Sequence, residues 1–321
     1  MFKTQITEML GIKYPIFCGS MMNISKPEFV AECSNAGALG ILASVMYRKP
    51  EPLRTALKQL FSLTKNPFAV NLNLFPMLMP VKQIDLIKAM IDEGVKIIET
   101  SGHQIPDEYI PLFKEHDIIW IHKCAGVRYA QKAQSLGANI VEIVGYENGG
   151  AVGNFDIGTF VLTPATVSAL NVPVVGGGGI VDGKGLVAIL SLGAQAGLMG
   201  TRLLLTKECP IHDNLKQALL HTSVYDTTLV LKSLNAAHRI WNNEGAKRVL
   251  KLEESKGSQA EILSEATGAK SLLMYEKGDI TAGIVSCGQG IGLCKDIPTV
   301  KNLIEKIMNE AKEIVQRLYN S

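Results

Sequence analysis

The fold is decided by residues 118–146, which read IIWIHKCAGVRYAQKAQSLGANIVEIVGY. Two continuous apolar runs, Ile118–Cys124 and Ile140–Tyr146, lack the apolar–polar alternation of a strand with one face in water. Such runs are typical of strands that are covered on both faces in a parallel sheet. Between them, Val127–Leu136 has helical spacing of its apolar residues, and Gly137 follows as the expected left-handed stop. The stretch therefore predicts a strand–helix–strand unit.

This unit recurs along the first two thirds of the chain. The expected strands are Pro15–Gly19, Leu39–Ala43, Phe68–Asn73, Lys96–Ser101, Ile118–Cys124, Ile140–Tyr146, Pro173–Gly178 and Ala196–Leu203. The expected helices are Lys26–Asn35, Glu51–Ser62, Lys82–Glu93, Val127–Leu136, Thr163–Leu170, Lys184–Leu192 and His212–Thr222. Eight successive units predict an α/β fold, a (β/α)₈ TIM barrel, with an open doubly wound sheet as the alternative.

The repeated strand–helix pattern ends at Thr222. Residues 226–278 have helical patterning with polar breaks, and we expect them to form an appended, smaller, mostly helical lid subdomain. The barrel would then comprise residues 1–225 and 279–321, and an amphipathic helix, Pro298–Tyr319, would close the chain.

Composition excludes several classes of function. The chain has 321 residues, 32 of them basic and 30 acidic, so the formal charge of +2 gives no field for holding nucleic acid. The amino terminus is polar, and no apolar run has the length of a membrane span, so we expect a soluble, cytoplasmic protein. The six cysteines show no CxxC spacing, which favours reduced thiols and disfavours a metal site.

In such a barrel the functional site lies at the carboxyl ends of the strands. The seventh expected strand runs into Gly176–Gly179, and the eighth ends in Leu198-Met199-Gly200-Thr201-Arg202. Glycine lets backbone N–H groups approach a phosphate closely, and the loops after strands seven and eight commonly hold phosphate. A bare tight turn would explain one glycine run, but two at consecutive strand ends favour a phosphate-bearing ligand.

Other strand ends carry further candidates. The glycine-rich loop 145–153 could lie against a flat ring system, or could be a flexible surface loop. Asn71 ends the third strand, where it could instead cap a neighbouring loop. Lys123 ends a buried strand and should meet an anion or an electron-rich ring, whereas His122 could equally be a satisfied core histidine.

These residues resemble a known family. The similarity lies in Pro15–Met22, Phe29–Gly40, Val70-Asn71, His122-Lys123-Cys124, Gly177–Gly179, Asp182-Gly183, Gly200-Thr201-Arg202 and Gly288-Gln289. Together they are similar to the nitronate monooxygenase family, formerly called 2-nitropropane dioxygenases. The patterns HKC-x-x-VR-x-A and GTR-x-L-x-T-x-ECP-x-H resemble its branch of bacterial NADH:quinone reductases, and flavin-dependent enoyl-acyl-carrier-protein reductases are related. The resemblance implies an FMN-binding barrel with a smaller added domain.

The resemblance also implies roles for individual residues. The FMN phosphate would lie on backbone around Gly177, Gly178, Gly179, Gly200 and Thr201. The ring and ribityl chain would be surrounded by Gly19, Ser20, Met21, Met22, Asn71, Lys123, Gly149, Gly150 and Gln289. Family members that oxidise nitronates usually carry a histidine where this chain has Ala151, and alanine cannot accept a proton.

We therefore expect an FMN-dependent oxidoreductase that passes hydride from NADH or NADPH to a small organic acceptor, a quinone or a conjugated enone or enoyl thioester. No dinucleotide fingerprint follows the first strand. Candidate proton donors are Tyr146, His122, Lys123 or a lid residue such as His238. The alternatives are a nitronate monooxygenase, a flavin-binding protein without turnover, and a phosphate-binding isomerase or aldolase without flavin. A homodimer is possible from the sequence.

Overall fold

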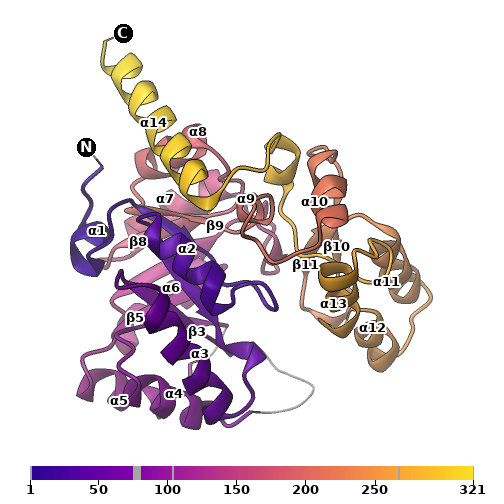
Figure 1. Cartoon of the computed structure of the whole chain (residues 1–321), viewed down its shortest axis with the longest axis horizontal. Coiled ribbons are helices and arrows are strands. Elements are labelled where there is room, and N and C mark those ends of the chain that lie inside the picture. Colours follow the sequence, from indigo (N-terminus) through magenta and orange to yellow (C-terminus); the bar gives the residue numbers. More distant parts are fainter. Residues whose placement is uncertain (1, 75–80, 103–104, 267, 321) are drawn as a thin grey trace.

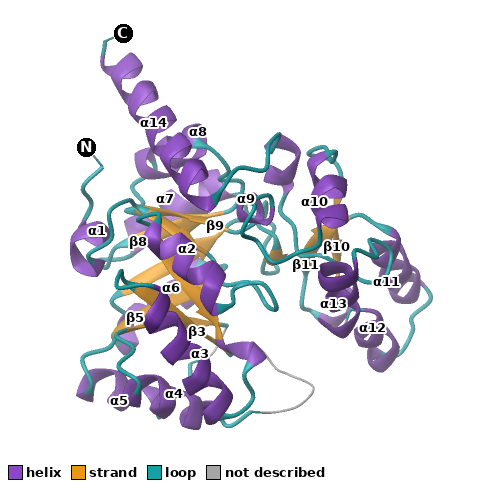
Figure 2. Cartoon of the chain, viewed as in Figure 1, coloured by secondary structure: helices purple, strands orange, loops and turns teal. Residues whose placement is uncertain are grey.

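The computed structural model describes residues 2–74, 81–102, 105–266 and 268–320. Eight parallel strands form a closed barrel (Figures 1 and 2). They are β1 (Ile16–Cys18), β2 (Leu39–Ala43), β3 (Phe68–Asn73), β4 (Ile97–Ser101), β5 (Ile119–Cys124), β6 (Ile140–Val144), β8 (Val174–Gly177) and β9 (Ala196–Met199). Strand β1 pairs with both β2 and β9, which closes the barrel and excludes the open sheet. The predicted TIM barrel is confirmed.

Helices alternate with these strands and cover the barrel (Figure 2). They are α2 (Pro27–Asn35), α3 (Pro50–Leu63), α4 (Gln83–Asp92), α5 (Tyr109–Glu115), α6 (Val127–Leu136), α7 (Thr159–Ala169) and α8 (Gly183–Ser191), followed by α9 (Thr201–Leu204) and α10 (Asp213–Leu220). Short 3₁₀ turns are η1 (Ser44–Met46), η2 (Lys232–Leu234) and η3 (Gln289–Leu293). The predicted stop after α6 is confirmed, since Gly137 has a φ of 104°.

One expected strand is shorter than predicted, which corrects the range Ala196–Leu203. Strand β9 ends at Met199, Gly200 turns the chain, and the apolar residues that follow form the short helix α9. Leu203 and Leu204 are buried in helical geometry against the core. A continuous apolar run does not distinguish a strand from a strand followed by a buried helical turn.

The two ends of the barrel differ. Helix α1 (Gln5–Leu10) plugs the amino-terminal end, where Ile6 and Leu10 join the apolar interior of the barrel. The backbone N–H of Gln5 also donates to the side chain of Gln195, just before β9, at 3.2 Å. The interior is therefore closed at this end, and a ligand can enter only at the carboxyl ends of the strands.

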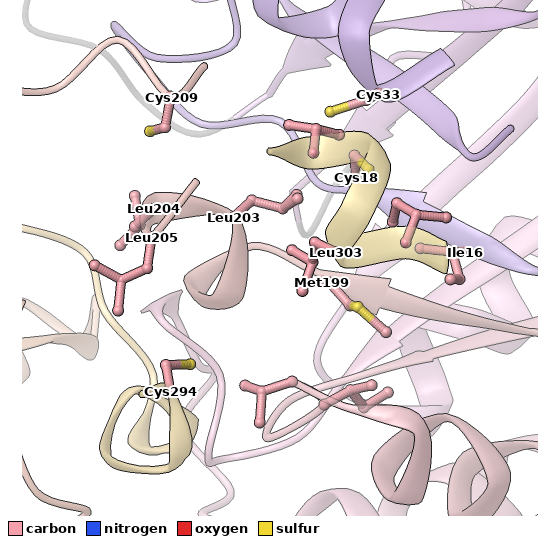
Figure 3. Close-up of a cluster of buried hydrophobic side chains, with 14 of the residues drawn as sticks. Ile16, Cys18, Cys33, Met199, Leu203, Leu204, Leu205, Cys209, Cys294 and Leu303 are labelled. Atoms are coloured by element: carbon pink, nitrogen blue, oxygen red, sulfur yellow. The ribbon is translucent and has the colours of Figure 1, made fainter. Parts of the chain in front are cut away.

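The largest apolar cluster lies outside the barrel, between β1, β9, α2 and the carboxyl-terminal helix α14 (Val300–Tyr319). Figure 3 shows Cys18, Cys33 and Leu303 among its side chains. All six cysteines are buried and unpaired as thiols. Helix α14 packs on α8, where a Cβ at Gly183 would lie 2.6 Å from the backbone nitrogen of Ala311.

The lid contains more strand than predicted. Besides α11 (Glu244–Glu254), α12 (Gln259–Glu265) and α13 (Gly268–Lys277), it contains β10 (Thr227–Val230) and β11 (His238–Trp241). These two strands form an antiparallel sheet with β7 (Gly150–Ala151), which comes from the loop after β6. The expectation of a mostly helical lid missed this sheet, because its short strands are stabilised by pairing between distant segments. Figure 1 shows the lid beside the mouth of the barrel.

Asn243 joins the lid helix α11 to the returning chain. Its side chain caps α11 by accepting from the N–H of Ala246 at 3.0 Å, and its amide donates to the carbonyls of Ile280 and Gly283 at 2.9 Å each. The residue is buried, so water cannot replace these partners.

We expect Asn243→Ala to destabilise the lid by about 2–3 kcal/mol, from one lost cap and two carbonyls left without a donor. Asn243→Ser keeps a capping oxygen and should cost less. Amide hydrogen exchange of α11 and urea unfolding measure both variants. Equal effects of alanine and serine would contradict the capping role.

Candidate functional site

Four strands place a polar layer inside the barrel. Asn71, Glu99, Lys123 and Glu142 follow the apolar interior residues of β3, β4, β5 and β6 by two positions. Because side chains alternate along a strand, all four point inward. In the register of the sheet, Asn71 lies beside Glu99, and Lys123 lies beside Glu142.

An ion pair organises this layer. The Nζ of Lys123 lies 2.7 Å from Oε1 of Glu99, and the Asn71 amide donates to Oε2 of Glu99 at 2.5 Å. Glu99 is fully buried, whereas the Lys123 side chain is 19% exposed and so reaches toward the mouth. Burial by itself would lower the pKa of Lys123, but the pKa is raised above its usual value, and the charge of Glu99 and the hydrogen bond to it contribute to this rise. Lys123 is therefore a cation.

Glu142 is the second buried carboxyl group of the layer. It is fully buried, and the described residues provide no hydrogen-bond partner to either of its oxygens. Burial, followed by the charge of Glu99, raises its pKa well above the usual range, and only Lys123 opposes this shift. The protonated form of Glu142 is therefore the favoured one. The layer then carries one positive and one negative charge.

His122 lies on the opposite face of β5 from Lys123. Its Nδ1 is 2.9 Å from the hydroxyl of Thr100, which also accepts from the indole of Trp120 at 2.7 Å. Trp120 in turn packs on Phe113 of α5, so this group lies between the sheet and the helices. The structure does not bring His122 together with the other candidates, because adjacent strand residues point to opposite faces.

Tyr146 begins the loop after β6 and faces the lid. The guanidinium of Arg239 lies 5.1 Å from the centre of its ring, and Arg239 Nε donates to the Tyr146 carbonyl at 3.0 Å. Burial lowers the pKa of Arg239. This contact attaches the strand-six loop to β11.

Three candidate loops meet at the mouth through close backbone contacts. A Cβ at Gly149 would lie 2.6 Å from the backbone nitrogen of Gly288, so only glycine fits there. The N–H of Gly288 donates to the Thr201 hydroxyl at 2.8 Å, and the N–H of Gln289 donates to the Glu147 carbonyl at 3.1 Å. The strand-six loop, the start of α9 and the segment before η3 therefore form one surface.

The glycines after β8 and β9 have two different roles. Gly178 has a φ of 111°, and a Cβ there would lie 2.4 Å from the Thr159 hydroxyl. Residue 178 must therefore be glycine because of its backbone conformation and its packing against the protein itself. In contrast, a Cβ at Gly200 would meet only Met21, at 3.9 Å. Within the described part of the chain, no hydrogen bond engages the N–H groups of Gly179, Gly200 and Thr201. Backbone N–H groups without a protein acceptor are suited to binding an anion.

The loop after β1 forms the facing wall. The N–H of Met21 donates to the Ser25 hydroxyl at 2.9 Å, which folds residues 19–25 into a compact turn. Met22 is 49% exposed and extends to Gly268 at the start of α13. Gly19, Ser20 and Met21 are thereby placed beside the end of β9, since the N–H of Gly19 donates to the Met199 carbonyl at 2.9 Å.

The structure pairs one candidate from the sequence, His238, with a residue that the sequence did not indicate, Ser286. His238 on β11 lies opposite Ala151 on β7, and its Nε2 is 2.8 Å from the hydroxyl of Ser286. The sequence indicated His238 only as one lid residue among possible proton donors, because nothing local shows which loop β11 pairs with. Ser286 had no signal in the sequence.

Among the described residues, no cluster of three or more histidine, cysteine, aspartate or glutamate side chains could hold a metal ion. In the same ranges, no helix has both the length and the apolar character needed to cross a membrane.

The protonated state of Glu142 predicts a pH effect on stability. A carboxyl group with a raised folded-state pKa stabilises the fold below its unfolded pKa of about 4.3, and this contribution is lost as the pH rises toward the folded value. Glu142→Gln mimics the neutral acid, so its unfolding free energy should fall less between pH 5 and pH 8 than that of the wild type. Thermal unfolding at both pH values measures the difference.

Glu99→Gln is the matched contrast. It removes the carboxylate that pairs with Lys123 and should destabilise the protein by roughly 3–5 kcal/mol. If Glu142→Gln were as destabilising as Glu99→Gln at pH 8, Glu142 would be ionised in the fold.

Comparison with known proteins agrees with this geometry. The family profile of nitronate monooxygenases matches residues 3–310. An indene-carboxyl-CoA dehydrogenase of Rhodococcus jostii is 31% identical, over 98% of both chains. A probable nitronate monooxygenase of Staphylococcus saprophyticus is 29% identical, over 98% of this chain and 99% of the relative.

Solved structures show the same architecture. FabK from Thermotoga maritima superposes with a TM-score of 0.91 at 32% identity, over 99% of each chain. A nitroalkane oxidase from Streptomyces ansochromogenes shares the fold, with a TM-score of 0.85 at 21% identity, over 98% of this chain and 99% of that chain. The profile match spans nearly the whole chain, and the chain therefore belongs to the nitronate monooxygenase family of oxidoreductases.

Proposed function

We propose that this chain is an FMN-dependent oxidoreductase that takes hydride from NADH or NADPH and passes it to a small organic acceptor, a quinone or a conjugated enone or enoyl thioester. The observation that carries the proposal is the set of backbone N–H groups at Gly179, Gly200 and Thr201 that make no hydrogen bond within the described part of the chain, together with Lys123, whose side chain is 19% exposed at the carboxyl end of β5. An anionic phosphate and an electron-rich ring are the ligands that such an arrangement suits.

The residues fit FMN. The phosphate would lie on the N–H cradle after β8 and β9, and the remaining cofactor would lie across the mouth. The residues that would hold it are Gly19, Ser20, Met21, Met22, Asn71, Lys123, Gly149, Gly150, Gly177, Gly178, Gly179, Gly200, Thr201 and Gln289. A bound flavin supplies the chemistry, because it accepts hydride from one substrate and gives it to the next. Lys123 would stabilise negative charge near the ring, since Glu99 and Asn71 fix its position.

Two apolar residues are exposed on the loops that we assign to the acceptor side. Met22 is exposed there, and Ala151 places only a methyl group on the exposed edge of β7. The lid contacts this side through Gly268, so we assign it to shaping the acceptor site. The coenzyme A thioester in the name of the Rhodococcus jostii relative favours a thioester among the possible acceptors.

Nitronate oxidation is the second candidate. The probable nitronate monooxygenases among the relatives favour it. Ala151 opposes it, because the usual family histidine at this place is absent and its base would have to come from another element.

A visible spectrum of the purified protein tests the proposal. We expect the yellow colour of a noncovalent flavin, release of FMN on denaturation, and bleaching when NADH or NADPH is added without oxygen. A colourless protein, or a flavin that neither nucleotide bleaches, would overturn it. Faster oxidation of a nitronate than of any quinone or enone would favour the second candidate.

Two glycine variants test the phosphate site. Gly200→Leu adds a side chain to open space beside Met21 and should raise the FMN dissociation constant about tenfold to a hundredfold, because charge-assisted bonds worth about 1.5–3 kcal/mol each are lost. The stability of the flavin-free protein should hardly change.

Gly178→Ala is the comparison, because its Cβ would collide with Thr159 at positive φ. It should lower the stability of the flavin-free protein by about 1–3 kcal/mol. Fluorescence titration with FMN and thermal unfolding separate the two effects. Unchanged FMN affinity in Gly200→Leu would contradict the placement of the phosphate.

A further inference from the structure

We propose that His238, paired with Ser286, is the proton-transfer group of the acceptor site. This role rests on the flavin-dependent hydride transfer proposed above. A quinone can take its protons from water, but a conjugated carbonyl compound needs a proton delivered to carbon in a site closed to water.

The lid sheet brings the pair to the mouth. His238 is directly opposite Ala151 in the antiparallel register of β11 and β7, so the two side chains project from the same face. The imidazole lies over Gly150, where an added Cβ would be 3.7 Å from its Cε1. Neither Gly150 nor Ala151 has a side chain long enough to cover the imidazole.

Ser286 connects the histidine to the cofactor loops. The chain at Ser286 forms a bridge to Ile240 of β11, and its hydroxyl is 2.8 Å from His238 Nε2. Two residues later, Gly288 donates to Thr201 at the start of α9. Ser286 is exposed, whereas its neighbours Cys287 and Gly288 are buried.

The other candidates are engaged elsewhere. Lys123 is paired with the buried Glu99, the Tyr146 ring packs against Arg239, and His122 lies on the outer face of β5. His212 caps α10 by accepting from the N–H of Asn214. Among the described histidines, His238 alone lies on the lid sheet beside the strand-six loop.

The chemistry follows from a neutral imidazole. Burial lowers the pKa of His238 to about 4, so the ring is uncharged at neutral pH and can accept a proton. In the oxidation of a saturated thioester, the α carbon–hydrogen bond would break, its proton would go to His238 directly or through Ser286, and the flavin would accept the β hydride. In the direction of reduction, the β carbon would receive the hydride that NAD(P)H supplies through the flavin. The neutral imidazole would pass its own N–H proton to the α carbon, directly or through Ser286, while its other nitrogen takes a proton from solvent.

The first experiment compares two acceptors on the flavin-loaded enzyme. In His238→Gln, the ratio of the cyclohexenone or crotonyl-CoA rate to the menadione rate should fall about a hundredfold to ten-thousandfold, because the general acid–base group is lost. Ser286→Ala should lower the same ratio less. His221→Gln is the matched control, since His221 follows α10, where its Nδ1 contacts the Gln217 carbonyl, and its ratio should not change.

A second variant tests the position rather than the fold. Because residues 151 and 238 are paired, His238→Ala combined with Ala151→His moves the imidazole across the strand pair. The double variant should reduce the enone or thioester at least ten times faster than His238→Ala alone. An unchanged ratio in His238→Gln, or no recovery in the double variant, would overturn the proposal. So would a wild-type enzyme that reduces menadione but neither unsaturated carbonyl probe.

A third measurement needs no turnover. In the flavin-free protein, NMR titration of labelled histidine rings should show one ring that titrates far below pH 6, and this signal should be absent in His238→Gln and shifted in Ser286→Ala. A normally titrating His238 ring would contradict the proposal. Failure of the flavin to bleach with NAD(P)H would contradict the proposed function instead, so the two failures are distinguishable.

Discussion

Alternation of side chains between the interior and the helical shell decides which polar residues can meet in a closed barrel. It sends Asn71, Glu99, Lys123 and Glu142 into one interior layer and sends His122 outward to Thr100, although His122 and Lys123 are neighbours in sequence. Lys123 can remain charged inside only because Glu99 is fixed beside it. The mouth therefore has a cation whose position is set by the sheet.

Much of this could be predicted from the sequence, because a strand covered on both faces must be continuously apolar and its helix must stop at a glycine. The β5–α6–β6 unit is the clearest example, and Lys123 at its strand end was correctly placed at the barrel mouth. The lid sheet could not be predicted in the same way. Strand β7 is only two residues long, and it is a strand only because β11 pairs with it. Pairing between segments so distant leaves no local pattern.

Glycine runs gave an ambiguous signal for a related reason. Gly178 and Gly200 look alike in sequence. Thr159 leaves no room for a side chain at Gly178, whereas Gly200 faces open space beside Met21. A glycine indicates that something approaches the backbone closely, but not whether that partner is the protein or a ligand. The distinction matters because only the second kind of glycine defines a binding site.

The fold sets the charges of the site, and these charges determine which ligands suit it. Glu142 is protonated, Lys123 is balanced by Glu99, and His238 is neutral because burial penalises its charged form. A mouth with so little net charge suits an uncharged acceptor and lets a single phosphate on the N–H cradle determine how an anionic cofactor is oriented. The hydride transfer that we propose would then need no charged group of the protein at the reacting carbon, and the neutral imidazole of His238 on the lid would supply the proton. In the proposed function, barrel and lid would have separate roles, since the barrel would hold the cofactor and the lid would place the proton-transfer group.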